Sequence, residues 1–222
     1  MERIAEFFHA GGLFMYLNLA IATISLAIIV DRTVFMIRSG SLNANVMLDM
    51  IRKLLISKRL DRAIKLVSRS NAPLLVVAKT ALTKVTKGDE AVAAAVEEAL
   101  VELTPNVKKR ISSLWALANV ATLLGLIGTI QGLIASFAAV GTAAAEERSQ
   151  KLAAGISEAM NNTWLGLVIA VSCIVGHLIL GNMSKKKVSE LEMFAIKIEN
   201  MLSEEWVAAA VSGPAPADEE SK

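Results

Sequence analysis

The sequence predicts an all-α membrane protein with three transmembrane helices, and two observations support this fold class. First, the chain of 222 residues carries 23 Lys or Arg and 21 Asp or Glu, yet none of these lies in residues 7–30, 111–145 or 159–184. A hydrocarbon core about 30 Å thick requires about 20 residues of apolar helix, so each window is long enough to cross it. Second, apolar residues outside the windows recur at helical spacing, and no strand pattern stands out. This distribution of charge argues against a soluble enzyme.

The first segment, residues 1–37, is predicted to combine a periplasmic N-terminal end with transmembrane helix 1. Its apolar window is too long for the apolar region of a signal peptide, and three charged residues, Glu2, Arg3 and Glu6, precede it. We therefore expect a retained helix. It shows no polar stripe of the kind described below, so it is interpreted as a plain membrane anchor.

Basic residues indicate the orientation of the spans, because loops rich in Lys and Arg stay on the cytoplasmic side. Residues 31–110 contain 15 of the 23 Lys and Arg residues, whereas residues 141–158 contain two. We therefore expect a cytoplasmic helical segment at 38–112 and a short periplasmic loop at 141–158. The C-terminus is expected to be cytoplasmic, with a helical extension at 185–212 and a disordered polar tail at 213–222.

The cytoplasmic segment is predicted to form several amphipathic helices. Gly88 should end one of them, Asp89 should cap the next, and Pro105 should kink that helix before the second window. The apolar positions that define these helices fall into four groups: Val46, Met50, Ile51, Leu54 and Leu55; Leu60, Ala63, Ile64 and Val67; Leu74, Val77, Ala78, Ala81, Leu82 and Val85; Val92, Val96, Leu100, Leu103 and Val107.

Transmembrane helices 2 and 3, predicted at 113–140 and 159–184, each carry a stripe of small and hydroxyl-bearing residues. A seven-residue spacing drifts by only about 20° around a helix, so such residues share one face. The stripes consist of Ala118, Thr122, Gly125, Thr129, Gly132 and Ser136 on helix 2, and Ala159, Thr163, Gly166, Ala170, Cys173 and His177 on helix 3. Two interpretations remain open: the stripes are helix–helix contact surfaces, or they face a common lumen that holds a ligand or another helix.

The apolar windows contain no carboxylate and no amine, although a lone ion transporter needs a titratable or ion-binding group at membrane depth. His177 is the one candidate within helices 2 and 3, either as a hydrogen-bonded helix residue or as part of a proton exit. Glu158 precedes helix 3. It is interpreted either as a solvated carboxylate at the helix end, or as part of a pore mouth that attracts cations or pairs with a basic residue of a partner. If the protein moves protons, the acid that carries them should therefore come from another chain.

The remaining composition excludes several other functions. A net charge of +2, without a basic patch interleaved with aromatic residues, argues against nucleic acid as a partner. The single cysteine, Cys173, lies in the third window, so neither a disulfide framework nor a cysteine metal site is expected. We expect no metal and no cofactor.

Two segments resemble the signatures of the MotA/TolQ/ExbB proton-channel family, in the correct order and on the correct spans. Residues 123–137, LLGLIGTIQGLIASF, resemble its second-span motif Gly-Leu-x-Gly-Thr-Val-x-Gly. Residues 155–168, GISEAMNNTWLGLV, resemble its third-span motif Gly-Ile-x-Glu-Ala-Leu-x-x-Thr-x-x-Gly-Leu. Three spans with an outside N-terminus favour the TolQ/ExbB branch, which is taken here to include related gliding-motility motor subunits.

The resemblance implies a homopentamer in the bacterial inner membrane, with helices 2 and 3 of each subunit around a central pore. It also implies two copies of an ExbD/TolR-like single-span partner, which carries the proton-binding Asp. The residues expected along the proton path are Thr122, Thr129, Ser136, Glu158, Thr163 and His177, and those expected to serve helix packing are Gly125, Gly128, Gly132, Gly166 and Ala170. The implied function is a proton-channel and motor subunit that converts proton motive force into work on the cell envelope.

Two other classes of function remain as alternatives. An ion-independent scaffold that only docks partner helices would show the same small-residue stripes. A membrane enzyme would need a nucleophile with a base, or a metal cluster, whereas the spans offer isolated Ser and Thr residues. We therefore predict that the protein is not an enzyme. Outer-membrane import, envelope maintenance and gliding motility remain open as the driven process.

Overall fold

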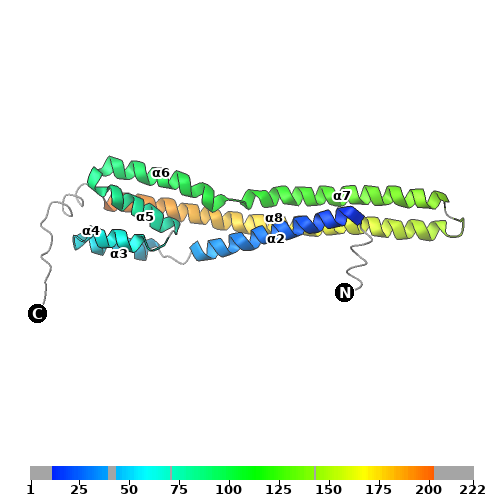
Figure 1. Ribbon diagram of the computed structural model, residues 1–222, viewed down its shortest axis with the longest axis horizontal. Helices are drawn as coiled ribbons and strands as arrows, with labels where there is room; N and C mark the ends of the chain where they lie inside the picture. Colours follow the sequence, from blue (N-terminus) through cyan, green and yellow to red (C-terminus); the bar gives the residue numbers. More distant parts are fainter. Residues whose placement is uncertain (1–11, 40–43, 71, 143, 203–222) are drawn as a thin grey trace, which may run out of the picture. The chain divides into compact units, whose positions relative to one another are not determined.

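The described part of the computed structural model covers residues 12–39, 44–70, 72–142 and 144–202, and its regular structure is entirely helical (Figure 1). This confirms the all-α prediction for these residues. The predicted disordered tail at 213–222 and the first eleven residues of the N-terminal segment lie outside the described residues. Chain contacts define two compact units: unit 1 contains Met1–Val34 and Arg110–Gly181, and unit 2 contains Phe35–Lys109 and Asn182–Lys222.

Unit 1 is built from three helices: most of α2 (Gly12–Ser39), all of α7 (Ile111–Thr142) and the first part of α8 (Arg148–Met201). Within this unit, α7 and α8 form an antiparallel hairpin and α2 lies along it (Figure 1). The three candidate membrane spans lie in Gly12–Arg38, Asp89–Thr142 and Arg148–Met201. The chain is therefore an all-α membrane protein.

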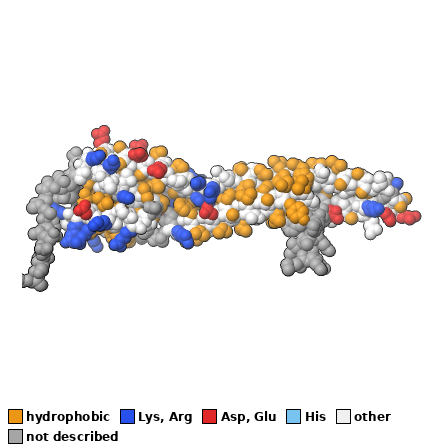
Figure 2. All heavy atoms as spheres, viewed as in Figure 1, with side chains coloured by type: hydrophobic (Ala, Val, Ile, Leu, Met, Phe, Trp, Pro, Cys, Tyr) orange, Lys and Arg blue, Asp and Glu red, His pale blue; other side chains and the backbone are white. Residues whose placement is uncertain are grey.

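The outer surface of unit 1 is apolar, as contact with lipid requires. Hydrophobic side chains gather over α7 on the face shown in Figure 2, and charged side chains appear near the turn between α7 and α8. Large exposed residues of this surface include Leu126, Ile130, Ile134, Phe137, Trp164, Leu167, Val171 and Val175. Small residues lie inside instead, because they let the helices approach closely.

The turn between α7 and α8 is shorter than the predicted loop at 141–158. Helix α8 already begins at Arg148, so the second half of that range is helical. The charges in this stretch exclude it from an apolar window but do not oppose a helix, and Leu152, Ala153 and Ala154 are strong helix formers. An ion pair of 2.8 Å between Lys151 Nζ and Glu147 Oε2 spans one turn at this end.

The chain leaves its helical path between α6 and α7 at a different place from the one predicted. Helix α6 (Asp89–Lys108) continues through Pro105, and the break comes at Lys109 and Arg110. Lys109 has an extended backbone with ψ 137°, and Arg110 adopts a left-handed conformation with φ 63°. Pro105 therefore does not end the helix, and the two residues at the boundary of the units separate α6 from α7.

Unit 2 combines short helices with the end of α8 around one apolar core. Its helices are α3 (Ala44–Ile56), α4 (Leu60–Val67), α5 (Pro73–Lys84), the 3₁₀ turn η1 (Val85–Lys87) and α6. Phe194 and Ile198 from the end of α8, and Leu202 just after it, are almost fully buried in this core. The four predicted helical stretches are present. Two assignments were wrong: Val46 and Met50 are exposed, whereas Met47 is buried.

The start of α6 also differs from the prediction. Gly88, rather than Asp89, is the residue that precedes the helix, and its φ of 97° is a conformation that glycine adopts without a steric penalty. Asp89 lies in the first turn, where its negative charge complements the positive end of the helix dipole.

Helix α2 is not the plain anchor that the sequence suggested. Its buried face carries three polar residues, Asn18, Ser25 and Arg32, beside the apolar Met15 and Ile21. Asn18 and Ser25 were missed because single polar residues in an apolar window do not reveal which face of the helix is buried. The side chain of Asn18 has no accessible surface, and Ser25 Oγ donates a hydrogen bond of 2.9 Å to the Ala22 carbonyl of its own helix.

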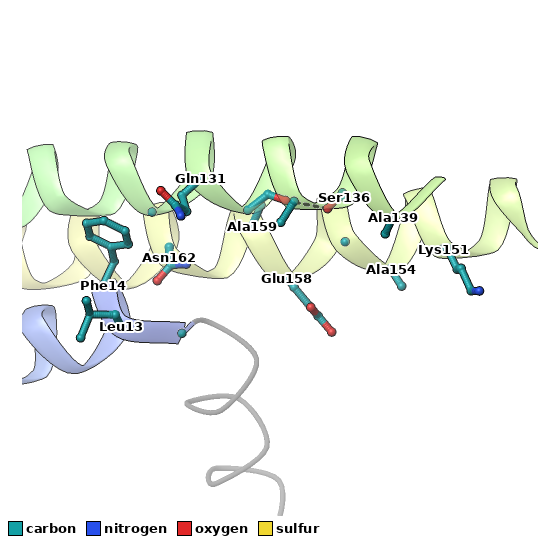
Figure 3. Close-up of a pocket in the computed structure, with 15 residues that line it drawn as sticks. Leu13, Phe14, Gln131, Ser136, Ala139, Lys151, Ala154, Glu158, Ala159 and Asn162 are labelled. Atoms are coloured by element: carbon teal, nitrogen blue, oxygen red, sulfur yellow. Dashed lines mark hydrogen bonds between the residues drawn. The ribbon is translucent and has the colours of Figure 1, made fainter. Parts of the chain in front are cut away.

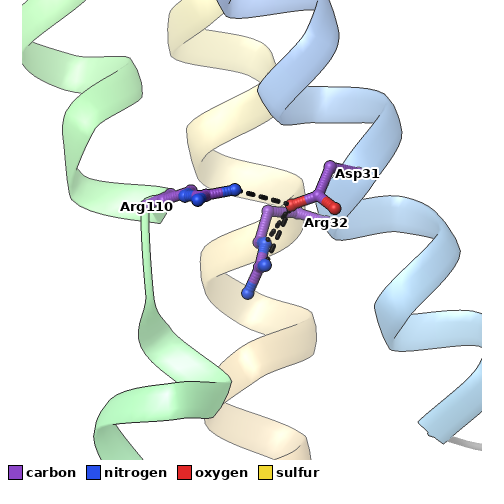
Figure 4. A network of polar contacts seen from close by, with 3 residues as sticks. All are labelled: Asp31, Arg32 and Arg110. Atoms are coloured by element: carbon purple, nitrogen blue, oxygen red, sulfur yellow. Dashed lines mark hydrogen bonds and ion pairs between the residues drawn. The ribbon is translucent and has the colours of Figure 1, made fainter.

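An acidic residue of α2 contacts the residue that precedes α7 (Figure 4). Asp31 Oδ2 accepts hydrogen bonds from Arg32 Nε at 3.0 Å and Arg32 Nη2 at 2.9 Å, and it lies 3.5 Å from Arg110 Nη1. The side chain of Arg32 is only 10% exposed, so its charge depends on such partners.

Replacing Asp31 by asparagine is expected to destabilise the chain by about 1–3 kcal/mol, because a nearly buried guanidinium loses a charged partner. The measurement is unfolding of the full-length protein in mixed detergent micelles. Glu147→Gln is the matched control. The side chains of Lys151 and Glu147 are 50% and 59% exposed, so their ion pair should contribute less than about 0.5 kcal/mol to stability. Equal stability losses in the two variants would contradict this role of Asp31.

Candidate functional site

The centre of the α7–α8 hairpin contains two hydroxyl groups in direct contact. Thr129 Oγ1 on α7 and Thr163 Oγ1 on α8 are hydrogen-bonded to each other. Thr129 Oγ1 also lies 2.9 Å from the Gly125 carbonyl oxygen and 3.2 Å from the Ala159 carbonyl oxygen, and Thr163 Oγ1 lies 3.3 Å from the Gly125 oxygen. Two hydroxyl protons therefore have several alternative acceptors, so the pair can rearrange its hydrogen bonds without becoming charged.

Glycines on both helices bring the two threonines together. A Cβ atom on Gly166 would lie 2.6 Å from the Ala121 carbonyl oxygen, and one on Gly125 would lie 3.0 Å from the Asn162 carbonyl oxygen. These contacts involve backbone atoms, which cannot rotate away as a flexible side chain would. The close approach of α7 and α8 at the threonine level therefore depends on the absence of side chains at these positions.

Most of the small-residue stripes lie in contacts within one chain. Ala118 and Ala121 of α7 pack with Ile169, Ala170 and Cys173 of α8 in a buried cluster that also includes Ile21 of α2. Gly132 faces Ala159, whose Cβ would lie 2.8 Å from an added Cβ. This geometry favours the interpretation of the stripes as helix–helix contact surfaces, with the half-buried Thr129 and Thr163 as their polar members.

The structure does not bring the other proposed path residues to this pair. Thr122 is exposed, and its hydroxyl donates a hydrogen bond of 3.0 Å to Ala118 O of its own helix. Ser136 is buried and donates at 2.7 Å to Gly132 O, also within its own helix. Glu158 is exposed near the hairpin turn. The predicted common line of hydroxyls is therefore divided between the helix contact and the outer surface.

His177 lies at the other end of the hairpin from Glu158. Its Nδ1 is 2.9 Å from the carbonyl oxygen of Ile111, the first residue of α7, and its ring centroid is 6.1 Å from that of Trp115. Fourteen residues of helix separate it from Thr163, which corresponds to about 21 Å along the axis. This geometry matches the alternative in which His177 is a hydrogen-bonded helix residue that joins α8 to the start of α7.

A cavity of about 680 Å³ lies beside the threonine pair (Figure 3). It is lined by the start of α2, by α7 from Gly128 to Ala139 and by α8 from Lys151 to Asn162. Sequence reasoning missed Gln131 and Asn162 as lining residues, and Asn162 is only 3% exposed. The available signal was weak: two amides in charge-free windows, next to motif residues.

The fold and the geometry of the hairpin define the class of the protein. The protein is a polytopic helical membrane protein. It has three apolar helices, two of which pack tightly as a hairpin, and a pair of hydrogen-bonded, uncharged hydroxyl groups lies at the centre of that hairpin.

Comparison with known proteins identifies the family. Residues 69–193 match the MotA/TolQ/ExbB proton channel family, and the chain belongs to this family. The match includes the whole of α7 and the part of α8 that carries Thr163. ExbB-like protein 3 from Synechocystis sp., which its name describes as a biopolymer transport protein, is 29% identical over 168 residues; the alignment covers 75% of this chain and 79% of that protein.

Proposed function

We propose that this chain is the channel subunit of an inner-membrane motor of the TolQ/ExbB branch, which converts proton motive force into mechanical work on the cell envelope. In this proposal five copies surround two copies of an ExbD/TolR-like partner, and the partner carries the acid that binds protons. The observation that carries the proposal is the half-buried hydroxyl pair of Thr129 and Thr163, in charge-free helices within the matched family region.

The chemistry of the pair suits a partner acid. A protonated carboxylic acid donates a hydrogen bond to a hydroxyl oxygen, and a carboxylate accepts one from a hydroxyl proton, so threonines can bind both states. Thr129 and Thr163 do not themselves ionise, so the charge that changes belongs to the guest acid. The apolar windows of this chain contain no carboxylate, which is why a second chain must supply it.

Proton flow would supply energy in small steps. One elementary charge that crosses 100 mV releases about 2.3 kcal/mol. Five subunits around two partner helices cannot match in symmetry, so neighbouring arrangements are nearly equal in energy. Such a mismatch favours stepwise rotation of one part against the other.

The proposed orientation places the N-terminus in the periplasm and the C-terminus in the cytoplasm. The excess of Lys and Arg between the first two spans supports it, because positively charged segments are retained on the cytoplasmic side. In this orientation the hairpin turn with Glu147, Lys151 and Glu158 faces the periplasm. Unit 2 is then the cytoplasmic part of the chain.

The ion-independent scaffold remains the second candidate, and one observation favours it. Gly125, Gly132, Gly166 and Ala170 all serve contacts inside a single chain, so packing alone accounts for much of the small-residue pattern. Packing does not require two hydroxyls at the centre of the contact. The two candidates therefore make opposite predictions for threonine variants.

The direct test is to purify the full-length chain with a single-span, Asp-containing partner and to reconstitute the complex in liposomes. Native mass spectrometry should give five copies of this chain with two of the partner. A pH-sensitive dye should report potential-driven proton uptake that is lost when the partner's Asp is changed to Asn. A monomeric or dimeric chain, or proton uptake that is independent of the partner, would contradict the proposal.

A further inference from the structure

The cavity beside the threonine pair is lined mainly by small and apolar residues, but it also contains polar side chains that packing does not require. Oxygen-bearing side chains from two helices contribute to it: Gln131 and Ser136 from α7, and Glu158 and Asn162 from α8. Figure 3 shows Gln131 and Asn162 close to Phe14 of α2, with Glu158 farther along the hairpin. The volume of about 680 Å³ has room for on the order of 20 water molecules at about 30 Å³ each.

The inner end of this cavity adjoins the hydroxyl pair. Gly128 and Asn162 line it there, and they directly precede Thr129 and Thr163 in the sequence. The Asn162 side chain fits against α7 because position 128 is glycine: a Cβ on Gly128 would lie 2.9 Å from Asn162 Cγ. Asn162 is 3% exposed, so the amide marks the deepest part of the polar lining.

The charged residues that line the cavity favour a cation. Lys151 also lines the cavity, but its Nζ is 2.8 Å from Glu147 Oε2, so its positive charge is offset by that carboxylate. Among the described residues, Glu158 has no ion-pair partner, which leaves its negative charge facing the cavity. A carboxylate in a cleft with low-dielectric walls raises the local concentration of cations.

We propose that this cavity is a water-filled entry vestibule, which carries the coupling cation to the threonine pair through the interior of each subunit. The inference rests on the proposed function and adds the route by which the cation enters. This route runs between α2, α7 and α8 of one chain, and not only through a lumen that all subunits share. Glu158, one helical turn before Asn162 on α8, attracts the cation, and Gln131, Ser136 and Asn162 provide hydrogen bonds to the water that conducts it. Polar groups at membrane depth are costly unless they are hydrated or paired, which is the physical reason for water here.

The test compares two adjacent positions on α7. Gln131 lines the cavity, whereas Ile130 is 51% exposed on the outer surface and does not line it. Gln131→Cys and Ile130→Cys are prepared in the full-length chain with Cys173→Ala, so that each protein has one thiol. Both are placed in lipid nanodiscs and treated with a water-soluble cationic methanethiosulfonate. The reagent reacts only with a thiolate that is in contact with water. The cysteine of Gln131→Cys is therefore expected to react at least about tenfold faster than that of Ile130→Cys.

The second measurement tests whether the charge of Glu158 and the transport of protons depend on this cavity. Glu158→Gln should slow the cationic reagent at Gln131→Cys without slowing a neutral analogue. In the reconstituted complex, modification of Gln131→Cys should block proton uptake, and modification of Ile130→Cys should not.

The outcomes separate this inference from the proposed function. Equal, slow labelling at the two positions would show a cavity filled by lipid or protein and would overturn the vestibule. Rapid labelling of Gln131→Cys that leaves proton uptake intact would overturn its role in entry. A complex that takes up no protons before labelling would contradict the proposed function instead, whatever the labelling rates.

Discussion

Replacing Thr163 by valine is expected to slow proton-driven work strongly while the complex still assembles. The change conserves volume and removes one hydroxyl from the pair at the centre of the hairpin. A hydrogen bond to a charged group is worth about 1.5–3 kcal/mol, so its loss in the transport cycle should slow proton uptake by about 10- to 150-fold. The measurement is proton uptake by liposomes that contain the chain and its partner.

The structure explains why this variant should remain folded. Thr129 retains the carbonyl oxygens of Gly125 and Ala159 as acceptors, so no buried hydroxyl loses all its partners. The matched control is Thr23→Val on α2, where an exposed hydroxyl donates only to Leu19 O of its own helix. Normal proton uptake in Thr163→Val, and in Thr129→Val combined with Thr163→Val, would refute the assigned role and favour the scaffold.

Replacing Gly166 by alanine is expected to destabilise the hairpin. The added Cβ would lie 2.6 Å from the Ala121 carbonyl oxygen and 3.1 Å from Gly125 Cα, so α7 and α8 must separate. Overpacking of this kind costs about 1–3 kcal/mol. Detergent-induced unfolding should therefore occur at a lower denaturant fraction, and the threonine pair should lose its contact.

Gly181→Ala is the control with the opposite expected sign. Gly181 lies in the same helix, and an added Cβ there has no neighbour within 4 Å. Alanine is a better helix former than glycine, so stability should be unchanged or rise by up to about 1 kcal/mol. If the two glycine variants have the same stability, the close approach of the helices at Gly166 is not a determinant of the hairpin.

The sequence by itself determined the class of the protein and the residues at its centre. Charge-free windows and apolar periodicity are properties of a linear chain, so an all-α membrane protein with three candidate spans could be predicted from them. Thr129 and Thr163 lie in recognisable motifs, and the chain proved to belong to the corresponding family. The helices of unit 2 were also predictable, because their apolar residues recur at helical spacing. The buried face of the first of them was assigned partly wrongly.

The tertiary structure alone decided which side chains meet. A helical stripe states that residues share a face, but the face that packs depends on the partner helix; thus Thr129 and Thr163 form a pair, whereas Thr122 lies on the outer surface. The cavity was equally beyond prediction, because its most buried polar residue, Asn162, owes its place to the missing side chain of Gly128 on another helix. Such contacts join residues that are distant in sequence, and the spacing along one helix carries no information about them.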